Sequence, residues 1–465
     1  MRTNSQTSRD AGNGTARISA SRREWLKGSG ALGLLALTGC GGGGGGAGSA
    51  SASQVTVSAG AQTSPPVTSP IVPSPLATPP LSPGSTVPAW YAAIAPGTWG
   101  VLPNSVLNGS AAQIYGALPG WNTINSNVLS PWSGGLLNTK GIYTSGAYDG
   151  ASVFIPGTFF CLWGGGHVDY GGNEMYCYGP LESSSPQWHC PRAATNPPPL
   201  DVEYDGSGNP VSRHSYCSLV YLPTTNRMMA VGTPYRWTDA GGGPDCATFQ
   251  FNMQNPATTQ PWAQLAHPTM PCMVTAYDAK LGGVWGLSML TYSVFFYDVT
   301  TNTWLEGNDN FNVGYYYMGA DVDVNRGIFA TFGGLYGGGH GLWFYTTNNG
   351  VSNQYWVPNT TGTGPNMSET GANGSIVYDA FNDCFVVWPG GGNGGTLYTL
   401  KAPATNPYQG GNLWTWTKIS PATGATPDLE SATGTFGRFR AVSNSVTPGY
   451  ILLNGVTSSI YFYRP

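Results

Sequence analysis

The chain has 465 residues, of which only 9% are charged, while glycine (68 residues), proline (37) and aromatic residues (12%) are abundant. This composition is typical of many short strands joined by turns, and it excludes a fold built from long solvent-exposed helices. The formal net charge is −4, and six of the 18 Lys and Arg residues precede Cys40, so the remainder is mildly acidic. A mildly acidic chain without a basic stripe excludes nucleic-acid binding.

Residues 1–40 carry the pattern of an exported lipoprotein. The segment SRREWLK at 21–27 matches the twin-arginine export pattern, with tryptophan where phenylalanine is usual, and a short apolar run follows at 28–37. This run is too short to span a membrane and is typical of a signal peptide. The residues LTGC at 37–40 resemble a bacterial lipobox, which implies lipidation of Cys40. We therefore expect twin-arginine export and a lipid anchor at the outer membrane, on its periplasmic or outer face, with Cys40 as the only membrane contact.

Residues 41–88 form the second predicted region. A glycine run is followed by sequence rich in Ser, Thr, Ala and Pro, with almost no charge. Such a segment cannot bury a core, so it predicts a disordered linker that tethers a head at residues 89–465.

The head contains six copies of one repeated unit. Each copy reads as an apolar strand, a second strand ending in glycine, a third aromatic strand and a segment centred on tryptophan. The predicted first strands are 150–155, 215–222, 272–277, 319–324, 375–378 and 440–443. The sixth copy lacks its tryptophan segment, and 98–102 (TWGVL) is the candidate to complete it. The fold predicted is an all-β, six-bladed β-propeller of four-stranded blades, its ring closed by this N-terminal strand. The alternative is a seven-bladed propeller, in which residues 111–140 form a degenerate blade.

The paired glycines that end the second strands and the tryptophan in the fourth resemble kelch blades and the central domain of galactose oxidase. This resemblance covers residues 95–465 and implies architecture rather than activity. Seven cysteines follow Cys40, an odd number, and the pairing of Cys177 with either Cys161 or Cys190 stays open. Their spacing does not indicate a structural zinc site.

Candidate site residues gather on one predicted face of the propeller. In an up-and-down blade, the loop after the second strand and the segment before the first strand open on the same face. The stretch LWGGGHVDYGGNEMYCY at 162–178 supplies one such loop, and the segment at 213–216 precedes the second unit. The predicted catalytic residues are His167, Tyr170, Arg213, His214 and Tyr216. The predicted substrate ligands are Asp169, Tyr292, Tyr316, His340, Glu369 and Arg438. Each also has a structural interpretation in blade packing, and Arg440 is a weaker choice than Arg438 because its position is partly inside the predicted strand.

Histidine, tyrosine and arginine at a propeller mouth favour a polysaccharide lyase that cleaves uronate-containing glycans by β-elimination. Arginine neutralises the carboxylate, and a His–Tyr set removes the C5 proton and protonates the leaving oxygen. These residue types resemble the sites of propeller lyases such as the ulvan lyases. The first alternative is a non-catalytic propeller that binds glycans or proteins. The second is a copper or other metal-dependent oxidase, although no histidine follows His340 to complete a copper site of the galactose-oxidase type. We expect no cofactor and no metal, and a polysaccharide or other extracellular ligand at the central mouth.

Overall fold

The computed structural model describes most of the head and none of the first 75 residues. The described residues are 76–81, 84, 86–107, 133–144, 153–165, 171–195, 202–205, 208–234, 236, 246–255, 261–268, 272–288, 293–306, 318–333, 341–347, 354–366, 374–390, 394–408, 412–421, 423–429, 434–455 and 458–465. Within them, no helix combines the length and the apolarity needed to cross a membrane.

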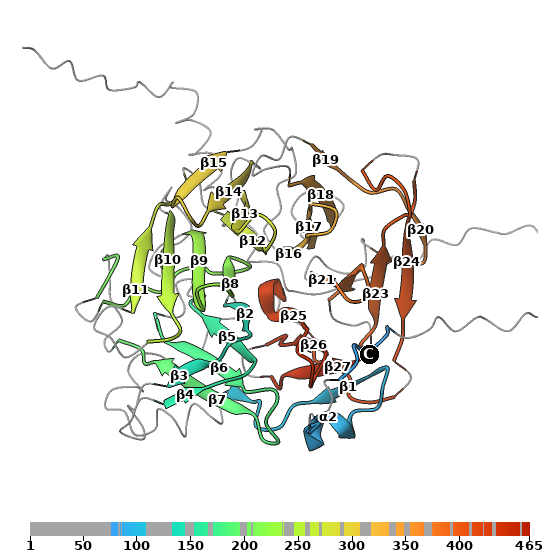
Figure 1. Cartoon of the computed structure of the whole chain (residues 1–465), viewed down its shortest axis with the longest axis horizontal. Helices are drawn as coiled ribbons and strands as arrows, with labels where there is room; N and C mark the ends of the chain where they lie inside the picture. The colour runs from blue at the N-terminus through green and yellow to red at the C-terminus, as the bar shows by residue number, and fades with distance from the viewer. Residues whose placement is uncertain are drawn as a thin grey trace, which may run out of the picture. The chain divides into compact units, whose positions relative to one another are not determined.

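The described residues form six antiparallel sheets of four strands each, arranged as the blades of a β-propeller (Figure 1). From the innermost strand outward, blades one to three are β2 (Gly134–Asn138), β5 (Phe159–Trp163), β6 (Met175–Gly179), β7 (Gln187–Arg192); β8 (Leu219–Leu222), β9 (Arg227–Pro234), β10 (Cys246–Asn252), β11 (Trp262–Leu265); and β12 (Cys272–Asp278), β13 (Gly283–Ser288), β14 (Val294–Asp298), β15 (Thr303–Glu306). Blades four to six are β16 (Met318–Asp323), β17 (Ile328–Gly333), β18 (Leu342–Thr346), β19 (Tyr355–Trp356); β21 (Ser375–Asp379), β22 (Cys384–Trp388), β23 (Leu397–Lys401), β24 (Trp414–Ile419); and β25 (Phe439–Val442), β26 (Gly449–Leu452), β27 (Tyr461–Arg464), β1 (Thr98–Val101). The prediction of a six-bladed β-propeller is confirmed.

Five short elements lie outside this pattern. Strand β20 (Thr360–Gly362) extends blade five by pairing parallel to β24, and β3 (Ile142–Thr144) pairs with β4 (Val153–Ile155) in a separate hairpin. The two short helical elements are α2 (Ala89–Ala93) and the 3-10 turn η2 (Phe436–Arg438).

The predicted first strand of blade one, 150–155, is wrong. The innermost strand is β2, which pairs with β5, whereas β4 belongs to the hairpin. The reason is burial. An innermost strand lies between neighbouring blades, and β2 is almost wholly buried, whereas Val153 and Phe154 are 46% and 40% exposed.

The N-terminal strand β1 is the outer strand of blade six. It pairs antiparallel with β27, with Thr98 opposite Arg464 and Trp99 opposite Tyr463. The indole of Trp99 is buried and donates a hydrogen bond to the Gly395 carbonyl at 2.7 Å. Closure of the ring by this strand stays a prediction.

The core consists of apolar layers between adjacent blades. Strands such as β5 (FFCLW) and β22 (CFVVW) are buried at every position, because both faces of a blade pack against neighbours. Between blades four and five, for example, Phe344 contacts Trp414 with ring centres 4.8 Å apart. Continuous apolar runs, rather than alternating ones, are the expected signature of strands buried on both faces.

An aspartate opens four of the turns that join neighbouring strands of a blade. In each, one carboxylate oxygen accepts hydrogen bonds from the backbone N–H groups two and three residues further on, and the residue four positions on has a positive φ. We call these the Asp turns; they begin at Asp278, Asp298, Asp323 and Asp379. Side-chain acceptance of turn N–H groups stabilises such turns locally. These carboxylates therefore stabilise the turns of the fold.

Candidate functional site

Of the eleven residues predicted at the loop face, four lie in the described part of the chain. They are Arg213, His214, Tyr216 and Arg438. Outside the described residues lie His167, Asp169, Tyr170, Tyr292, Tyr316, His340 and Glu369, together with the predicted lipidation site Cys40. The roles proposed for those residues stay predictions.

The segment that precedes blade two is bonded to the end of β5. The Gly165 N–H donates to the Arg213 carbonyl at 2.6 Å, and the Ser215 hydroxyl donates to the Trp163 carbonyl at 2.7 Å. These bonds hold residues 213–216 against the C-terminal end of β5.

Arg213 is fully buried and paired within the chain. Its Nη2 donates to both carboxylate oxygens of Glu203, at 2.8 and 2.7 Å, and its guanidinium carbon lies 5.6 Å from the centre of the Phe249 ring. A carboxylate of the protein thus occupies the position that a substrate carboxylate takes in the predicted clamp.

His214 and Tyr216 form a hydrogen-bonded pair. The His214 Nδ1 lies 3.0 Å from the Tyr216 hydroxyl, and both side chains are buried. Tyr216 has φ = +30°, an uncommon conformation for a bulky residue, and its ring packs edge-on against Phe436 with centres 5.2 Å apart. An imidazole next to a phenol is a plausible acid–base set for proton transfer, once a substrate reaches it.

Arg438 lies within η2 and is fully buried. Its guanidinium donates to four backbone carbonyls, those of Ser133 (2.7 Å), Gly434 (2.6 Å), Leu453 (3.0 Å) and Asn454 (3.2 Å). Burial lowers the pKa of Arg438 to about 9. These bonds connect the start of blade one to blade six. Arg438 therefore acts as a structural crosslink here, and a role in ligand binding stays a prediction.

Glu174, which the sequence analysis did not select, is a buried carboxyl directly before β6. Burial raises its pKa to about 8, against the opposing effects of its own backbone N–H and a hydrogen bond with Tyr176. In the sequence, Glu174 is marked only by its place at the end of the residues GGNE, directly before a predicted strand. Such a position does not by itself indicate a buried carboxyl group.

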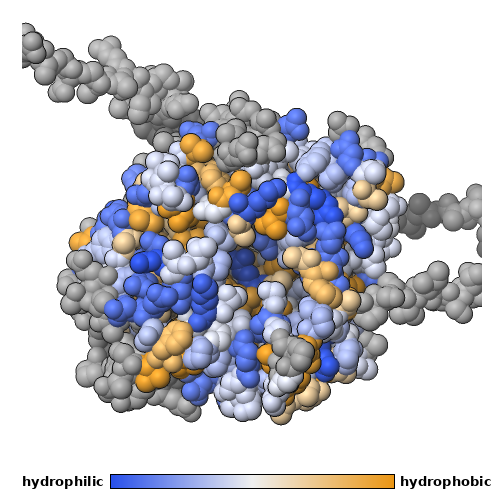
Figure 2. All heavy atoms as spheres, in the orientation of Figure 1, coloured by the Kyte–Doolittle hydropathy of each residue, from blue (hydrophilic) through white to orange (hydrophobic). Residues whose placement is uncertain are grey.

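A cavity of about 320 Å³ lies where the six innermost strands meet. Its lining includes Leu136 of β2, Val220 of β8, Ala276 of β12, Asp321 of β16, Val442 of β25 and Asp379 of β21. Ala380 and Phe381, in the turn between the first two strands of blade five, also line it. The cavity therefore lies toward the ends of the innermost strands opposite to the predicted loop face. The space-filling view shows the ring hollowed near its centre (Figure 2).

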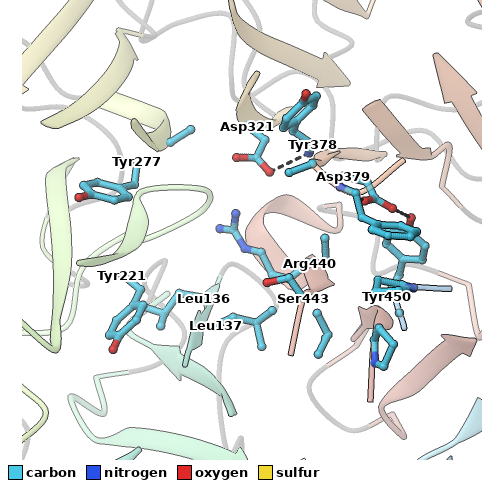
Figure 3. Close-up of a pocket in the computed structure, with 18 of the residues that line it drawn as sticks. Leu136, Leu137, Tyr221, Tyr277, Asp321, Tyr378, Asp379, Arg440, Ser443 and Tyr450 are labelled. Carbon is cyan, nitrogen blue, oxygen red and sulfur yellow. Dashed lines mark hydrogen bonds between the residues drawn. The ribbon is translucent and has the colours of Figure 1, made fainter. Parts of the chain in front are cut away.

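Two oppositely charged side chains reach into this cavity, Arg440 from β25 and Asp321 from β16 (Figure 3). Nη2 of Arg440 donates to the Gly135 carbonyl at 2.8 Å, and its Nε donates to the same oxygen at 3.2 Å. Asp321 accepts from the backbone N–H groups of Tyr378 (2.8 Å) and Val322 (2.9 Å). Among the described residues, these two side chains form no direct ion pair with each other, and Nη1 of Arg440 has no bonded partner.

The environment of Asp321 favours its neutral form more than water does. Burial raises its pKa, while the Tyr378 N–H and the nearby Arg440 guanidinium act in the opposite direction. The Arg440 guanidinium also packs against η2, since a Cβ on Gly437 would lie 2.6 Å from its Nη2. Arg440 and Asp321 thus lie deep in the ring.

The tyrosines around the cavity point away from this charged pair (Figure 3). The Tyr221 hydroxyl donates to Asn226 at 2.9 Å, that of Tyr378 to Asp383 at 2.7 Å, and that of Tyr450 to Asp379. These hydroxyls are engaged in the turns of the blades. The polar side chains of the lining other than these tyrosines are Arg440, Asp321, Asp379 and Ser443, of which Asp379 is engaged in an Asp turn.

No group of three or more His, Cys, Asp or Glu side chains within the described ranges is arranged to hold a metal ion. Six of the described cysteines are buried free thiols, namely Cys161, Cys177, Cys190, Cys217, Cys246 and Cys384, and Cys161 lies directly opposite Cys177 in the β5–β6 register.

Comparison with known proteins gives distant similarity only. No family model and no curated protein matches the sequence. Among solved structures, the chain is similar to the major allergen Mala s 1 of Malassezia sympodialis, at 14% identity and a TM-score of 0.38, over 66% of this chain and 89% of the allergen. It is also similar to an auxiliary nutrient binding protein from Bacteroides ovatus, at 12% identity and a TM-score of 0.38, over 78% of this chain and 76% of that protein. Similarity at this level carries no argument about function.

Proposed function

We propose that this protein is a ligand-binding β-propeller whose central cavity takes a small, uncharged, polyhydroxylated ligand, a sugar of one or two residues. The observation that carries the proposal is the placement of Arg440 and Asp321 in one cavity without a direct ion pair. The cavity volume of about 320 Å³ is at the lower end of the range for ligand pockets.

The charges of the cavity favour a neutral ligand. An anion attracted by Arg440 meets repulsion from Asp321, and a cation meets the reverse. A hydroxyl group accepts from a guanidinium and donates to a carboxylate, so neighbouring hydroxyls of one sugar satisfy both groups. Both side chains are already held by backbone groups, so little ordering is needed on binding.

The test is isothermal titration of the full chain with neutral mono- and disaccharides, uronates and amino acids. The variants are Arg440→Met and Asp321→Asn, with Lys418→Met on the outer strand β24 as the matched control. Loss of a hydrogen bond to a charged group weakens binding by roughly tenfold to a hundredfold, so we expect such losses in both cavity variants and none in the control. If no neutral sugar binds, or if both cavity variants bind as the wild type does, the proposal fails. If only amino acids bind, the sugar proposal is rejected, and the ligand of the cavity is a zwitterion instead.

A second candidate function, a uronate polysaccharide lyase at the opposite face, is favoured by the His214–Tyr216 pair. In that mechanism one member of the pair removes the C5 proton of the uronate, and the other protonates the leaving oxygen. The full chain is incubated with a panel of uronate polysaccharides while the absorbance of the unsaturated product is followed. A rate that falls at least a hundredfold in His214→Gln and Tyr216→Phe supports the lyase, and no absorbance change with any substrate rejects it.

We propose that the protein is exported by the twin-arginine route and anchored by a lipid at Cys40. We also propose that its blades are related to kelch blades. The support is the leader sequence and the paired glycines of the second strands. Metabolic labelling with a radiolabelled fatty acid should mark the membrane fraction of the wild type. Cys40→Ala should lose both the label and the membrane association, and retention of either contradicts the anchor.

A further inference from the structure

Six residues of the predicted linker, 76–81 (LATPPL), lie against the propeller at the cavity. We call this segment the strap. Pro79 of the strap lines the cavity together with Phe381 and the C-terminal Pro465. The strap therefore reaches the same cavity as Arg440 and Asp321.

The strap is bonded to blade five through a single asparagine. The Ala77 N–H donates to Oδ1 of Asn382 at 3.1 Å, and Nδ2 of Asn382 donates to the Ala77 carbonyl at 3.1 Å. Asn382 is itself positioned by an Asp turn, because its Nδ2 also donates to Oδ2 of Asp379 at 2.7 Å. The side-chain amide thus satisfies both backbone polar groups of Ala77, as a neighbouring strand would.

Two further contacts hold the ends of this short stretch. The Thr78 hydroxyl donates to the Pro465 carbonyl at 2.8 Å, and the Leu76 side chain packs against the apolar cluster between blades five and six. Pro79 and Pro80 restrict the backbone, so the strap is stiff after Thr78. The Ala77–Asn382 bonds are exposed to solvent, and exposed bonds of this kind open at low free-energy cost.

We propose that the strap is a built-in gate that covers part of the cavity mouth and competes with ligand for access to Arg440 and Asp321. As regulation of that site, this inference rests on the proposed function. The predicted linker that tethers the head would then also control the occupancy of the cavity, because the strap is part of that linker.

Access to the cavity is measured without any ligand by modifying Arg440 with phenylglyoxal, a dicarbonyl that reacts with arginine. The rate at Arg440 is followed by peptide mass spectrometry in the full chain, with Arg227 as the internal reference. Asn382→Ala removes both bonds to Ala77, and Ala77→Pro removes one of them from the strap side without altering the blade. Pro80→Ala is the matched control, since Pro80 is exposed.

We expect modification of Arg440 to be roughly tenfold faster in Asn382→Ala and Ala77→Pro, with Arg227 unchanged and Pro80→Ala equal to the wild type. Equal rates at Arg440 in all four proteins overturn the gate, whatever the sugar titrations show. Faster modification in the two strap variants supports the gate even if no sugar binds, and in that case only the proposed function fails. If sugars bind, the association rate constant should rise in the same two variants, and an unchanged constant overturns the competition.

Discussion

Glu174 should make the stability of the propeller depend on pH in the opposite direction to an ordinary surface carboxylate. Its side chain is fully buried, and burial raises its pKa from 4.5 to about 8. The informative perturbation is Glu174→Gln, which keeps the shape of the side chain and removes its titration.

The sign follows from proton counting. Between pH 4.5 and about 8 the native protein holds a proton on Glu174 that the unfolded chain has released. The free energy of unfolding therefore falls as pH rises through this window. The stabilisation by the bound proton is complete below pH 4.5 and is lost as pH passes about 8. Since one pKa unit corresponds to about 1.4 kcal/mol, the full change is at most ~5 kcal/mol, a large share of the stability of a typical domain.

The assay is urea unfolding of the wild type and Glu174→Gln at several values between about pH 5 and pH 8. The difference between the two proteins cancels the titration of every other group. We expect the wild type to lose stability relative to the variant as pH rises, by at least ~2 kcal/mol across the window. Parallel pH profiles would refute the reasoning, because they would mean that Glu174 ionises in the native state as it does in the unfolded chain.

Three further predictions concern buried polar groups. Arg438→Met leaves four backbone carbonyls without their donor and should lower the free energy of unfolding by about 3 kcal/mol or more in urea melts; a loss below ~1 kcal/mol contradicts the crosslink. Asp278→Ala removes the acceptor of two turn N–H groups and of the Trp285 indole, and should cost about 2–4 kcal/mol, whereas Lys280→Ala in the same turn should stay within ~0.5 kcal/mol. Burial raises the pKa of the Cys177 and Cys217 thiols, so a thiol reagent at mildly alkaline pH should label them only after unfolding; labelling of the native protein on mixing would contradict this.

The strand pattern was predictable because each blade repeats the same physical requirement. Strands predicted at 272–277 and 375–378, for example, correspond to β12 and β21 within one residue. Glycines and turn residues mark the ends of runs that are otherwise apolar throughout. The prediction missed β2 because its short run GGLLN carries no aromatic residue. The segment 150–155, which includes the apolar run VFI, was therefore predicted as the first strand of blade one.

The arginines show why the site was harder to predict than the fold. Arg438 and Arg440 are two residues apart, and the sequence favoured Arg438. In the structure Arg438, at the end of η2, donates to four backbone carbonyls outside η2, whereas Arg440 on β25 reaches the cavity. No periodicity separates these positions, because both sides of a propeller strand are buried. The usable signal was an ionisable residue inside an apolar innermost strand, as with Arg440 in FRAV and Asp321 in MGADVD.

The pairing of β1 with β27 has a consequence for the order of assembly. It joins Thr98 to Arg464, almost the whole length of the head apart in sequence. During synthesis, β1 leaves the ribosome early but cannot form its antiparallel pairing until β27 emerges, so we expect blade six to be completed after the other blades. Contacts this distant in sequence also slow folding, because a long loop must close before they form. Arg440 belongs to the same blade, so a chain truncated before β27 should fail to build a complete cavity.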